Sequence, residues 1–306
     1  MNIEVLLTEA EIADEFAESI EARDLPEKFF YWSAPSVKAW QALAARSEDR
    51  LRPTWEALAA KVPELTKPFG ARVPVISFGA GDGGRDRMLL KSLAAAGRDL
   101  KYYPVDASQT LLEAACAGAE DDDIETLGIK ADISSPMHLL LAADVSEAPR
   151  LLLMVGNTLA GFDPLDQVRH LASCVHKGDM LILDATIHGG TPVKPSGEQR
   201  RFAFAPLAST GLTSDDGELE YAEKADDRLD GLFMMTRRFH ASRDLRLLAL
   251  GRDVNIARGE RIMLNFRYLF SKEALRWLLT EHAGLRIVGE IPSPDGRFLT
   301  AVCIKA

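Results

Sequence analysis

The sequence of 306 residues contains only three cysteines, no long hydrophobic run and no basic stretch. Each of these absences argues against a class of protein. Cys116, Cys174 and Cys303 are scattered without C-x-x-C spacing, so we expect neither a metal site nor a disulfide framework. No uninterrupted apolar segment approaches the ~18 residues of a membrane span, and the first residues are acidic where a signal peptide is basic. Acidic residues outnumber basic ones by 46 to 36, which argues against nucleic acid as a partner. We therefore expect a soluble, cytoplasmic protein that is a monomer, with a homodimer as the alternative.

Hydrophobic residues make up 47% of the sequence, which is enough to bury a large α/β core and a smaller lobe. The most informative stretch begins with the apolar run 73–78 and continues into a glycine cluster at residues 79–84. Apolar residues then recur at helical spacing up to Leu93, and a second apolar run at residues 102–105 ends at Asp106. A strand, a glycine turn, a helix and a strand that ends in an acid are typical of a unit that binds the ribose of an adenosine-containing cofactor.

Five predicted strands, joined mostly through helical patterns, favour a doubly wound, mostly parallel sheet. They cover residues 73–78, 102–105, 126–131, 150–155 and 180–185. Residues 1–70 are expected to be helical, because no glycine precedes Gly70 and apolar residues recur at four-residue spacing. Residues 29–32 are four consecutive aromatics, which either plug an interface between lobes or line a pocket for a small molecule.

The pattern changes after residue 188. Residues 189–230 are rich in Gly, Pro, Ser and acids, and we interpret them as an irregular or helical insertion. Three strands of β-meander type are predicted at residues 233–241, 246–250 and 261–270. A helix at residues 272–283 and a hairpin made of residues 287–291 and 298–304 are expected to return the chain to the main sheet.

The glycine turn by itself fits two cofactors. Gly79, Gly81 and Gly84 satisfy the pattern G-x-G-x-x-G, and Asp106 lies where a dinucleotide site places its ribose acid. An NAD-dependent dehydrogenase is therefore one interpretation.

Three further features favour S-adenosylmethionine. The third predicted strand ends in Asp132 and Ile133, and in class I methyltransferases such a pair meets the adenine amino group and covers the ring. The fourth ends in Gly156, Asn157 and Thr158, where the backbone must approach the methyl-donor end closely. Nothing in the sequence resembles the catalytic His or the Tyr-x-x-x-Lys dyad of hydride-transfer enzymes. The sequence therefore predicts S-adenosylmethionine as the cofactor.

Over most of its length the chain resembles the ergothioneine-pathway family of histidine Nα-methyltransferases. The segment LPEKFFY at residues 25–31 is similar to the family's L-P-x-K-[FW]-F-Y, and FGAG with RMLL at residues 78–90 is similar to its L-G-x-G and R-x-L-L. YPVD at residues 103–106 matches x-P-x-D, and ADI at residues 131–133 stands where the family has G-D-F. GNTL at residues 156–159 and ARGE at residues 257–260 correspond to G-[SG]-T-I and A-x-G-E.

This resemblance implies a Rossmann-type class I methyltransferase core with a smaller α+β substrate lobe. Residues 1–65 are then the helical part of the substrate lobe and residues 66–188 the cofactor-binding core. Residues 189–270 form the insertion that completes the substrate lobe, and residues 271–306 return to the core sheet.

The resemblance also implies which residues hold the cofactor. Gly79 and Gly81 approach its methionine part, and Asp106 accepts both ribose hydroxyl groups. Arg85 stands where the family has a lysine near the cofactor carboxylate, a change that keeps the charge but alters the geometry. The predicted cofactor site comprises Gly79, Gly81, Arg85, Asp106, Asp132, Ile133, Gly156 and Asn157.

The substrate pocket departs from the family. Gly161 replaces the asparagine that holds the substrate's amino and carboxylate groups, and Asn265 and Arg267 replace the glutamate and serine that read the imidazole ring. An arginine presents a donor fork suited to carboxylate or phosphate oxygens, so we expect an acceptor other than histidine that carries an acidic group. Alternatively, Arg267 and Arg237 pair with acids of their own lobe. The predicted substrate residues are Tyr31, Thr158, Gly161, Met235, Asn265 and Arg267.

The predicted reaction is N-methylation of an amino-acid-like small molecule. Methyl transfer from a sulfonium is an in-line displacement, so the protein mainly aligns the acceptor and excludes water. An amine acceptor must lose a proton, and Tyr31 is the predicted catalytic residue, with a carboxylate reached through water as the alternative. O-methylation of a small anionic metabolite, a dehydrogenase and a cofactor-binding protein without catalysis are the other interpretations.

Overall fold

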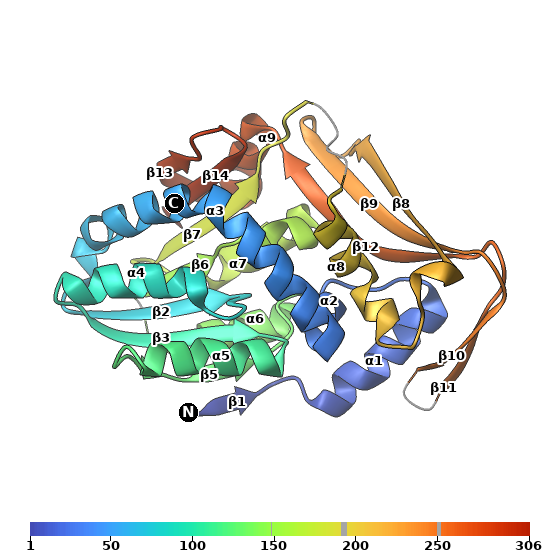
Figure 1. Cartoon of the computed structure of the whole chain (residues 1–306). Coiled ribbons are helices and arrows are strands. Elements are labelled where there is room, and N and C mark those ends of the chain that lie inside the picture. Colours follow the sequence, from blue (N-terminus) through green and yellow to red (C-terminus); the bar gives the residue numbers. More distant parts are fainter. Residues whose placement is uncertain (148, 191–194, 250–251) are drawn as a thin grey trace.

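A mostly parallel sheet forms the core of the molecule (Figure 1). The computed structural model describes residues 1–147, 149–190, 195–249 and 252–306, without the side chains of residues 47–50, 248 and 249. The strands of this sheet are β1 (Ile3–Val5), β2 (Arg72–Phe78), β3 (Asp99–Asp106), β4 (Glu125–Thr126), β5 (Gly128–Lys130), β6 (Leu151–Met154), β7 (Met180–Thr186), β13 (Leu285–Pro292) and β14 (Phe298–Lys305). Among the described residues their order is β1-β5-β3-β2-β6-β7-β14-β13, with β4 also beside β3.

The pairing confirms the predicted doubly wound architecture. The strands from β1 to β7 run parallel to their neighbours, whereas β14 is antiparallel to β7 and β13 is antiparallel to β14. β3 lies on one side of β2 and β6 on the other, so the connection from β2 to β3 and the connection from β6 to β7 lead in opposite directions along the sheet. Ligands of such sheets bind at the carboxyl ends of the strands, where the strand order reverses.

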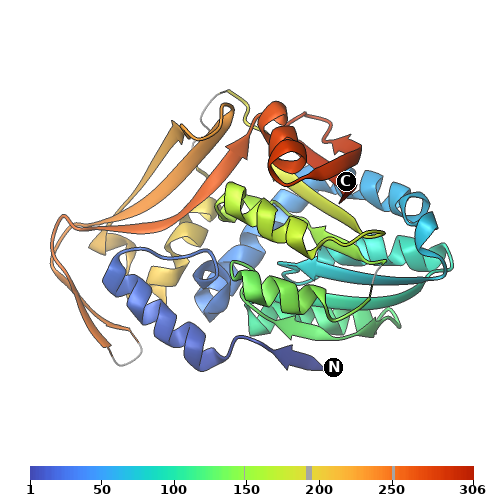
Figure 2. The same cartoon turned by 180° about the vertical axis from the view of Figure 1, so that it is seen from behind.

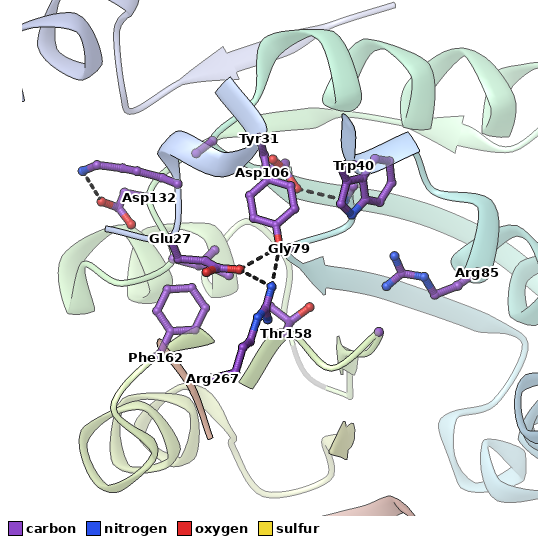
Figure 3. Close-up of a pocket in the computed structure, with 15 residues that line it drawn as sticks. Glu27, Tyr31, Trp40, Gly79, Arg85, Asp106, Asp132, Thr158, Phe162 and Arg267 are labelled. Carbon is purple, nitrogen blue, oxygen red and sulfur yellow. Dashed lines mark hydrogen bonds and ion pairs between the residues drawn. The ribbon is translucent and has the colours of Figure 1, made fainter. Parts of the chain in front are cut away.

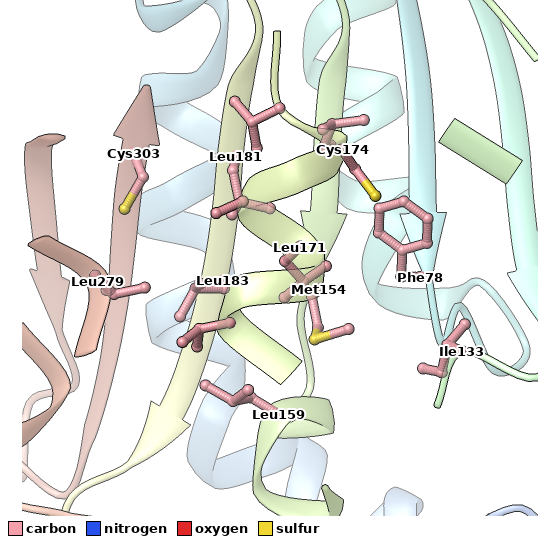
Figure 4. Close-up of a cluster of buried hydrophobic side chains, with 14 of the residues drawn as sticks. Phe78, Ile133, Met154, Leu159, Leu171, Cys174, Leu181, Leu183, Leu279 and Cys303 are labelled. Atoms are coloured by element: carbon pink, nitrogen blue, oxygen red, sulfur yellow. The ribbon is translucent and has the colours of Figure 1, made fainter. Parts of the chain in front are cut away.

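Helices cover both faces of the sheet (Figures 1 and 2). One layer consists of α3 (Ala34–Leu65), α4 (Gly84–Ala95) and α5 (Gln109–Glu120), and the other of α6 (Pro136–Ala143), α7 (Pro164–Cys174) and α9 (Lys272–Trp277). Alternate side chains of β2 enter the two layers: Val73 and Val75 pack with α3 and α4, whereas Ile76 and Phe78 pack with α6 and α7 (Figure 4). Because β2 is buried on both faces, its sequence is a continuous apolar run, which made it predictable.

A second lobe packs against the carboxyl ends of the parallel strands (Figure 1). It contains α1 (Glu9–Ala22), α2 (Phe29–Trp32), α8 (Gly197–Ala208), β8 (Gly217–Ala225), β9 (Leu232–Ala241), β10 (Leu245–Ala249), β11 (Arg252–Ile256) and β12 (Arg261–Phe270). Among the described residues these strands form a sheet of order β12-β9-β8 and the hairpin β10-β11. One apolar cluster joins α1, α2 and α8 to the strands. The Leu25 N–H donates to the Met263 carbonyl at 3.0 Å and the His188 N–H to the Phe270 carbonyl at 2.8 Å, which anchors β12 at two points.

Three details differ from the predictions. Ile3–Val5 forms β1 beside β5 rather than helix, because three residues are too few for a periodic signal. The insertion contains β8, an edge strand whose alternating glutamates and lysine hide the apolar pattern of a strand. β11 was not predicted, and the strand expected at residues 246–250 is β10, with residue 250 outside the described residues.

The strands predicted at residues 233–241 and 261–270 and the C-terminal hairpin are confirmed. The helix predicted at residues 272–283 begins as α9 and continues as a π-helix at Leu278–His282. The boundaries of the four predicted segments, at residues 65, 188 and 270, stay predictions. Within the described parts of the chain, every helix is too short or too polar to cross a membrane.

Candidate active site

Two adjoining cavities lie where the parallel strands meet the second lobe. The first, of about 630 Å³, is lined by residues that follow β2, β3, β5 and β6, including Gly79, Asp106, Asp132 and Thr158 (Figure 3). The second, of about 1730 Å³, extends from the end of β7 to the sheet β12-β9-β8 and to α3 and α8. The two spaces meet at a wall whose residues line both of them: Tyr31, Trp40, Arg85, Gly156 and Arg267.

The glycine turn after β2 has a backbone conformation that favours glycine. Gly79 and Gly81 have φ angles of 72° and 59°, and a Cβ at Gly79 would lie 2.7 Å from Cγ2 of Thr158. The N–H of Gly81 donates to Oδ2 of Asp106 at 2.9 Å, and the N–H of Ser108 donates to Oδ1 at 2.9 Å. The turn and the acid therefore form one unit at the edge of the first cavity. Burial raises the pKa of Asp106, although the backbone donors oppose this effect.

Asp132 and Ile133 line the opposite part of the first cavity. Lys28 from the second lobe donates to Oδ2 of Asp132 at 2.6 Å and also pairs with Glu15. The Ser134 hydroxyl donates to Oδ1 at 2.6 Å. Burial alone would raise the pKa of Asp132, but the ammonium group of Lys28 outweighs it, so the pKa is lowered. The role of Lys28 was not predicted, because its partner lies 104 positions away in the sequence.

Arg85 and Gly156 are matched to each other. Gly156 has a φ angle of 90°, and a Cβ at this position would lie 1.3 Å from Nη1 of Arg85. The same nitrogen donates to the Val155 carbonyl at 3.1 Å, and the guanidinium group lies 5.5 Å from the centre of the Trp55 ring. The absence of a side chain at residue 156 therefore makes room for the arginine at the wall between the cavities.

Asp184 in β7 holds the turn that follows β6. Its carboxylate accepts the N–H of Gly156 at 2.8 Å and the N–H of Asn157 at 2.6 Å. Burial raises the pKa of Asp184 to about 6. The side chain of Asn157 accepts the Thr186 N–H at 2.9 Å, so this amide also fixes the turn. Asp184 was not predicted as a site residue, although an acid within the apolar run of residues 180–185 is itself a signal.

Three polar side chains meet at the wall between the cavities (Figure 3): Tyr31 and Arg267, which line both cavities, and Glu27, which lines the first. Arg267 donates to Oε1 of Glu27 at 2.7 Å and to the Tyr31 hydroxyl at 3.0 Å, and Tyr31 donates to Oε1 of Glu27 at 2.7 Å. Burial, followed by the Glu27 carboxylate, raises the pKa of Tyr31 well above its usual value. Oε2 of Glu27 is buried without a hydrogen-bond partner among the described residues. Glu27 was missed because it occupies the variable position of the L-P-x-K motif.

Two predicted substrate residues, Gly161 and Asn265, line neither of the two described cavities. A Cβ at Gly161 would lie 2.7 Å from Cδ of Glu27, so the glutamate fills the space that a side chain at residue 161 would occupy. Asn265 is buried at a β-bulge between Met263 and Phe266, has a φ angle of 69° and lines neither described cavity. The bulge adds one residue to β12, so Asn265 and Arg267 do not share a face as regular alternation predicts.

The second cavity is lined by one face of the sheet β12-β9-β8. Side chains two residues apart on each strand contribute to it: Tyr221, Glu223, Met235, Arg237, Arg267 and Leu269. Nε2 of His188 lies 2.9 Å from Oε1 of Glu223, and the His188 ring stacks on Phe233 with ring centres 3.9 Å apart. Of the predicted substrate residues, Tyr31, Met235 and Arg267 line this cavity, and Thr158 lines the first.

The residues of the first cavity fit S-adenosylmethionine. Gly79 and Gly81 line this cavity without side chains, and they lie beside an acid for a ribose and an arginine for a carboxylate. Asp132 and Ile133 provide an acceptor and an apolar contact suited to an adenine. The donors and acceptors therefore match the adenine, the ribose and the carboxylate of this cofactor.

The sequence matches a family model described as histidine-specific methyltransferase, SAM-dependent, over residues 9–186, which is more than half of the chain. No curated protein sequence matches it.

Several solved structures align with most of this chain at low sequence identity. An S-adenosylmethionine-dependent methyltransferase from Clostridium acetobutylicum is 13% identical, with 87% of this chain and 99% of that chain covered and a TM-score of 0.47. An O-methyltransferase family protein from Burkholderia thailandensis is 14% identical, with 95% and 62% covered and a TM-score of 0.47. The 1,6-didemethyltoxoflavin-N1-methyltransferase of Burkholderia thailandensis, with 1,6-didemethyltoxoflavin and S-adenosylhomocysteine bound, is 11% identical, with 90% and 91% covered and a TM-score of 0.42.

Proposed function

Because the chain belongs to the family of histidine-specific, S-adenosylmethionine-dependent methyltransferases, we propose that it N-methylates an amino-acid-like small molecule other than histidine. The observation that carries this proposal is the buried cluster of Glu27, Tyr31 and Arg267 at the wall between the two cavities. The family membership sets the dehydrogenase interpretation aside, since these enzymes use S-adenosylmethionine.

The first cavity is the proposed cofactor site. Asp106 would bind the ribose hydroxyl groups, Asp132 and Ile133 the adenine, and Arg85 the carboxylate, while the backbone at Gly79 and Gly81 approaches the methionine part. When bound, S-adenosylmethionine supplies an electrophilic methyl group on a sulfonium centre. Gly156 and Arg267 belong to the wall that this group must face, because the second cavity begins there.

Glu27 is the proposed partner of the acceptor amine. Oε2 of Glu27 is buried without a partner, so an N–H group of the acceptor would satisfy it and fix the direction of the nitrogen lone pair. Tyr31 is a poor general base, because its raised pKa keeps the phenol protonated and its proton is donated to Glu27. Glu27 therefore takes over the proton-accepting role that the sequence predicted for Tyr31, and Tyr31 positions the glutamate.

Two arguments favour an amine other than that of histidine. The positions that hold histidine in the family are changed here, and Glu27 occupies the space beside Gly161. A carboxylate acceptor has no N–H or O–H to donate to the unpartnered Oε2 of Glu27 and would meet it oxygen to oxygen, which disfavours O-methylation of an acid. An amine or its ammonium form can donate a hydrogen bond to the same oxygen.

The test is an incubation of the enzyme and S-adenosylmethionine with a metabolite extract, followed by mass spectrometry for products that gain one methyl group. Methyl esters are hydrolysed by mild base whereas N-methyl groups are not, so a base-labile product would overturn the N-methylation proposal. The variant Glu27→Gln should keep its affinity for S-adenosylhomocysteine and lose about 100-fold or more in methyl transfer. Glu64→Gln, in an exposed pair with Lys67, is the matched control. Wild-type transfer by Glu27→Gln would contradict the role of the carboxylate.

A further inference from the structure

The face of the sheet β12-β9-β8 in the second cavity carries charged side chains from all three strands. Glu223 lies on β8, Arg237 on β9 and Arg267 on β12. Glu223 is bonded to His188, and Arg267 is bonded to Glu27. Arg237 is the exception, because its Nη1 is buried and the structure shows no hydrogen bond or ion pair for its side chain among the described residues.

Burial without a partner is unfavourable for a guanidinium group. Arg237 is only 7% exposed, and burial, followed by the nearby charge of Arg267, lowers its pKa to about 10. A buried charge is normally compensated by an opposite charge or a set of hydrogen bonds. The charge of Glu27 offsets part of this effect, but no acid of the described residues bonds to Arg237, so a ligand in the cavity is the natural source of a directly bonded anion.

A second unsatisfied group lies beside Arg237. Tyr221 on β8 is directly opposite Arg237 on β9, so the two side chains share a face and are neighbours across the strands. The Tyr221 hydroxyl is also buried without a partner among the described residues, and it lines the same cavity. A guanidinium fork and a phenol therefore offer hydrogen-bond donors side by side.

We propose that Arg237 and Tyr221 form a subsite for a carboxylate group of the methyl acceptor, remote from the amine that is methylated. The inference rests on the proposed function, because it takes the second cavity as the acceptor site. One guanidinium balances a single negative charge, which fits a carboxylate better than a doubly charged phosphate. The neighbouring Arg267 is already neutralised by Glu27 and adds no free charge.

The position of the subsite sets the spacing within the acceptor. Arg267 is paired with Met235 across β12 and β9, and Arg237 lies two residues farther along β9. With strands about 4.8 Å apart and about 3.4 Å per residue, the backbones of Arg267 and Arg237 are about 8 Å apart. The amine beside Glu27 and the carboxylate beside Arg237 are therefore expected at different ends of the acceptor rather than on one carbon atom.

A series of ω-amino acids tests this arrangement. Glycine, β-alanine, 4-aminobutanoate, 5-aminopentanoate and 6-aminohexanoate place the two groups at increasing separation, and amino alcohols of the same lengths lack the carboxylate. Affinities are measured by calorimetry with the S-adenosylhomocysteine-loaded enzyme, so turnover is not needed. We expect affinity to rise with length beyond glycine, and amino alcohols to bind at least tenfold more weakly than the acids of equal length.

Arg237→Met should lower the affinity for the longer amino acids at least tenfold and leave the amino alcohols unaffected, while Tyr221→Phe should cause a loss of a few fold. Arg238→Met is the matched control, because Arg238 is the next residue on β9 and points to the opposite face. Unchanged affinity of the acids in Arg237→Met would overturn the subsite.

The melting temperature of Arg237→Met without ligand provides a second readout. It should equal or exceed that of the wild type, since an uncompensated buried charge has been removed. A large decrease would show that the fold itself compensates the charge, and would also overturn the proposal. Arg237-dependent binding without any methyl transfer would instead contradict the proposed function and leave the subsite intact.

Discussion

Replacing Gly156 by alanine should disturb both the fold and the binding of the cofactor. The φ angle of 90° is one that L-residues rarely adopt, and the added Cβ would lie 1.3 Å from Nη1 of Arg85. Backbone strain of this kind costs about 1–3 kcal/mol. Arg85 must also leave its place, and the loss of its bond to the Val155 carbonyl adds about 1.5–3 kcal/mol. We therefore expect a loss of roughly 2.5–6 kcal/mol in the free energy of unfolding.

The consequence for the cofactor follows from the displaced arginine. If Arg85 binds the cofactor carboxylate, its displacement should weaken the binding of S-adenosylhomocysteine by about 10- to 100-fold. Urea denaturation followed by circular dichroism gives the stability, and titration calorimetry gives the affinity. Both measurements are made on the same preparations.

Gly178→Ala is the control for strain alone. Gly178 has a φ angle of 98°, but a Cβ there would lie no closer than 3.8 Å to another atom, at Pro149. This variant should lose about 1–3 kcal/mol of stability and keep its affinity for S-adenosylhomocysteine. In an Arg85→Ala background, where the clash is absent, Gly156→Ala should cost no more than Gly178→Ala does in the wild type. Equal stability and equal affinity of Gly156→Ala and Gly178→Ala would refute the reasoning.

Two further predictions concern ionised groups. Burial raises the pKa of Asp184 to about 6, so the native state holds a proton that the unfolded state releases near pH 4, and the contribution of Asp184 to stability falls as the pH rises from about 4 to about 6. Asp184→Asn should flatten the decrease of the unfolding free energy over this range, as measured by urea titration at pH 4.5 and pH 7; an unchanged slope would contradict the assignment. Lys28→Met removes the charge that lowers the pKa of Asp132, so the affinity for S-adenosylhomocysteine should begin to fall at a higher pH on acidification than in the wild type. Calorimetry between pH 4 and pH 7 checks this, and coincident pH profiles would show that Lys28 does not control Asp132.

The core was predictable because its signals are local. β2 is buried on both faces and therefore reads as one apolar run, and the glycines that follow it are required by their backbone angles. β8 gave no such signal, since Tyr221 and Glu223 face a polar cavity and the intervening residues face solvent. A strand that lines a binding site lacks the apolar alternation on which prediction depends.

The candidate site was predictable in part for the same reason. Asp106 and Asp132 were found from their positions at strand ends, where neighbours in sequence define the environment. Glu27 and Arg267 meet across 240 positions, so nothing near Glu27 in the sequence indicates its partner. The bulge that turns Asn265 away from the cavities depends on the pairing of β12 with β9, which the sequence does not display.

The contact between Gly161 and Glu27 constrains how this pocket can evolve. A larger residue at position 161 would collide with the glutamate, because its Cβ would lie 2.7 Å from Cδ of Glu27. Removing the glutamate first would leave Arg267 as an unpaired buried cation, which costs about 3–5 kcal/mol. The three positions are therefore coupled, and the introduction of a side chain at position 161 requires changes at Glu27 and Arg267 as well or passes through a destabilised intermediate. We therefore expect the selectivity of this pocket to change through combined substitutions rather than single ones.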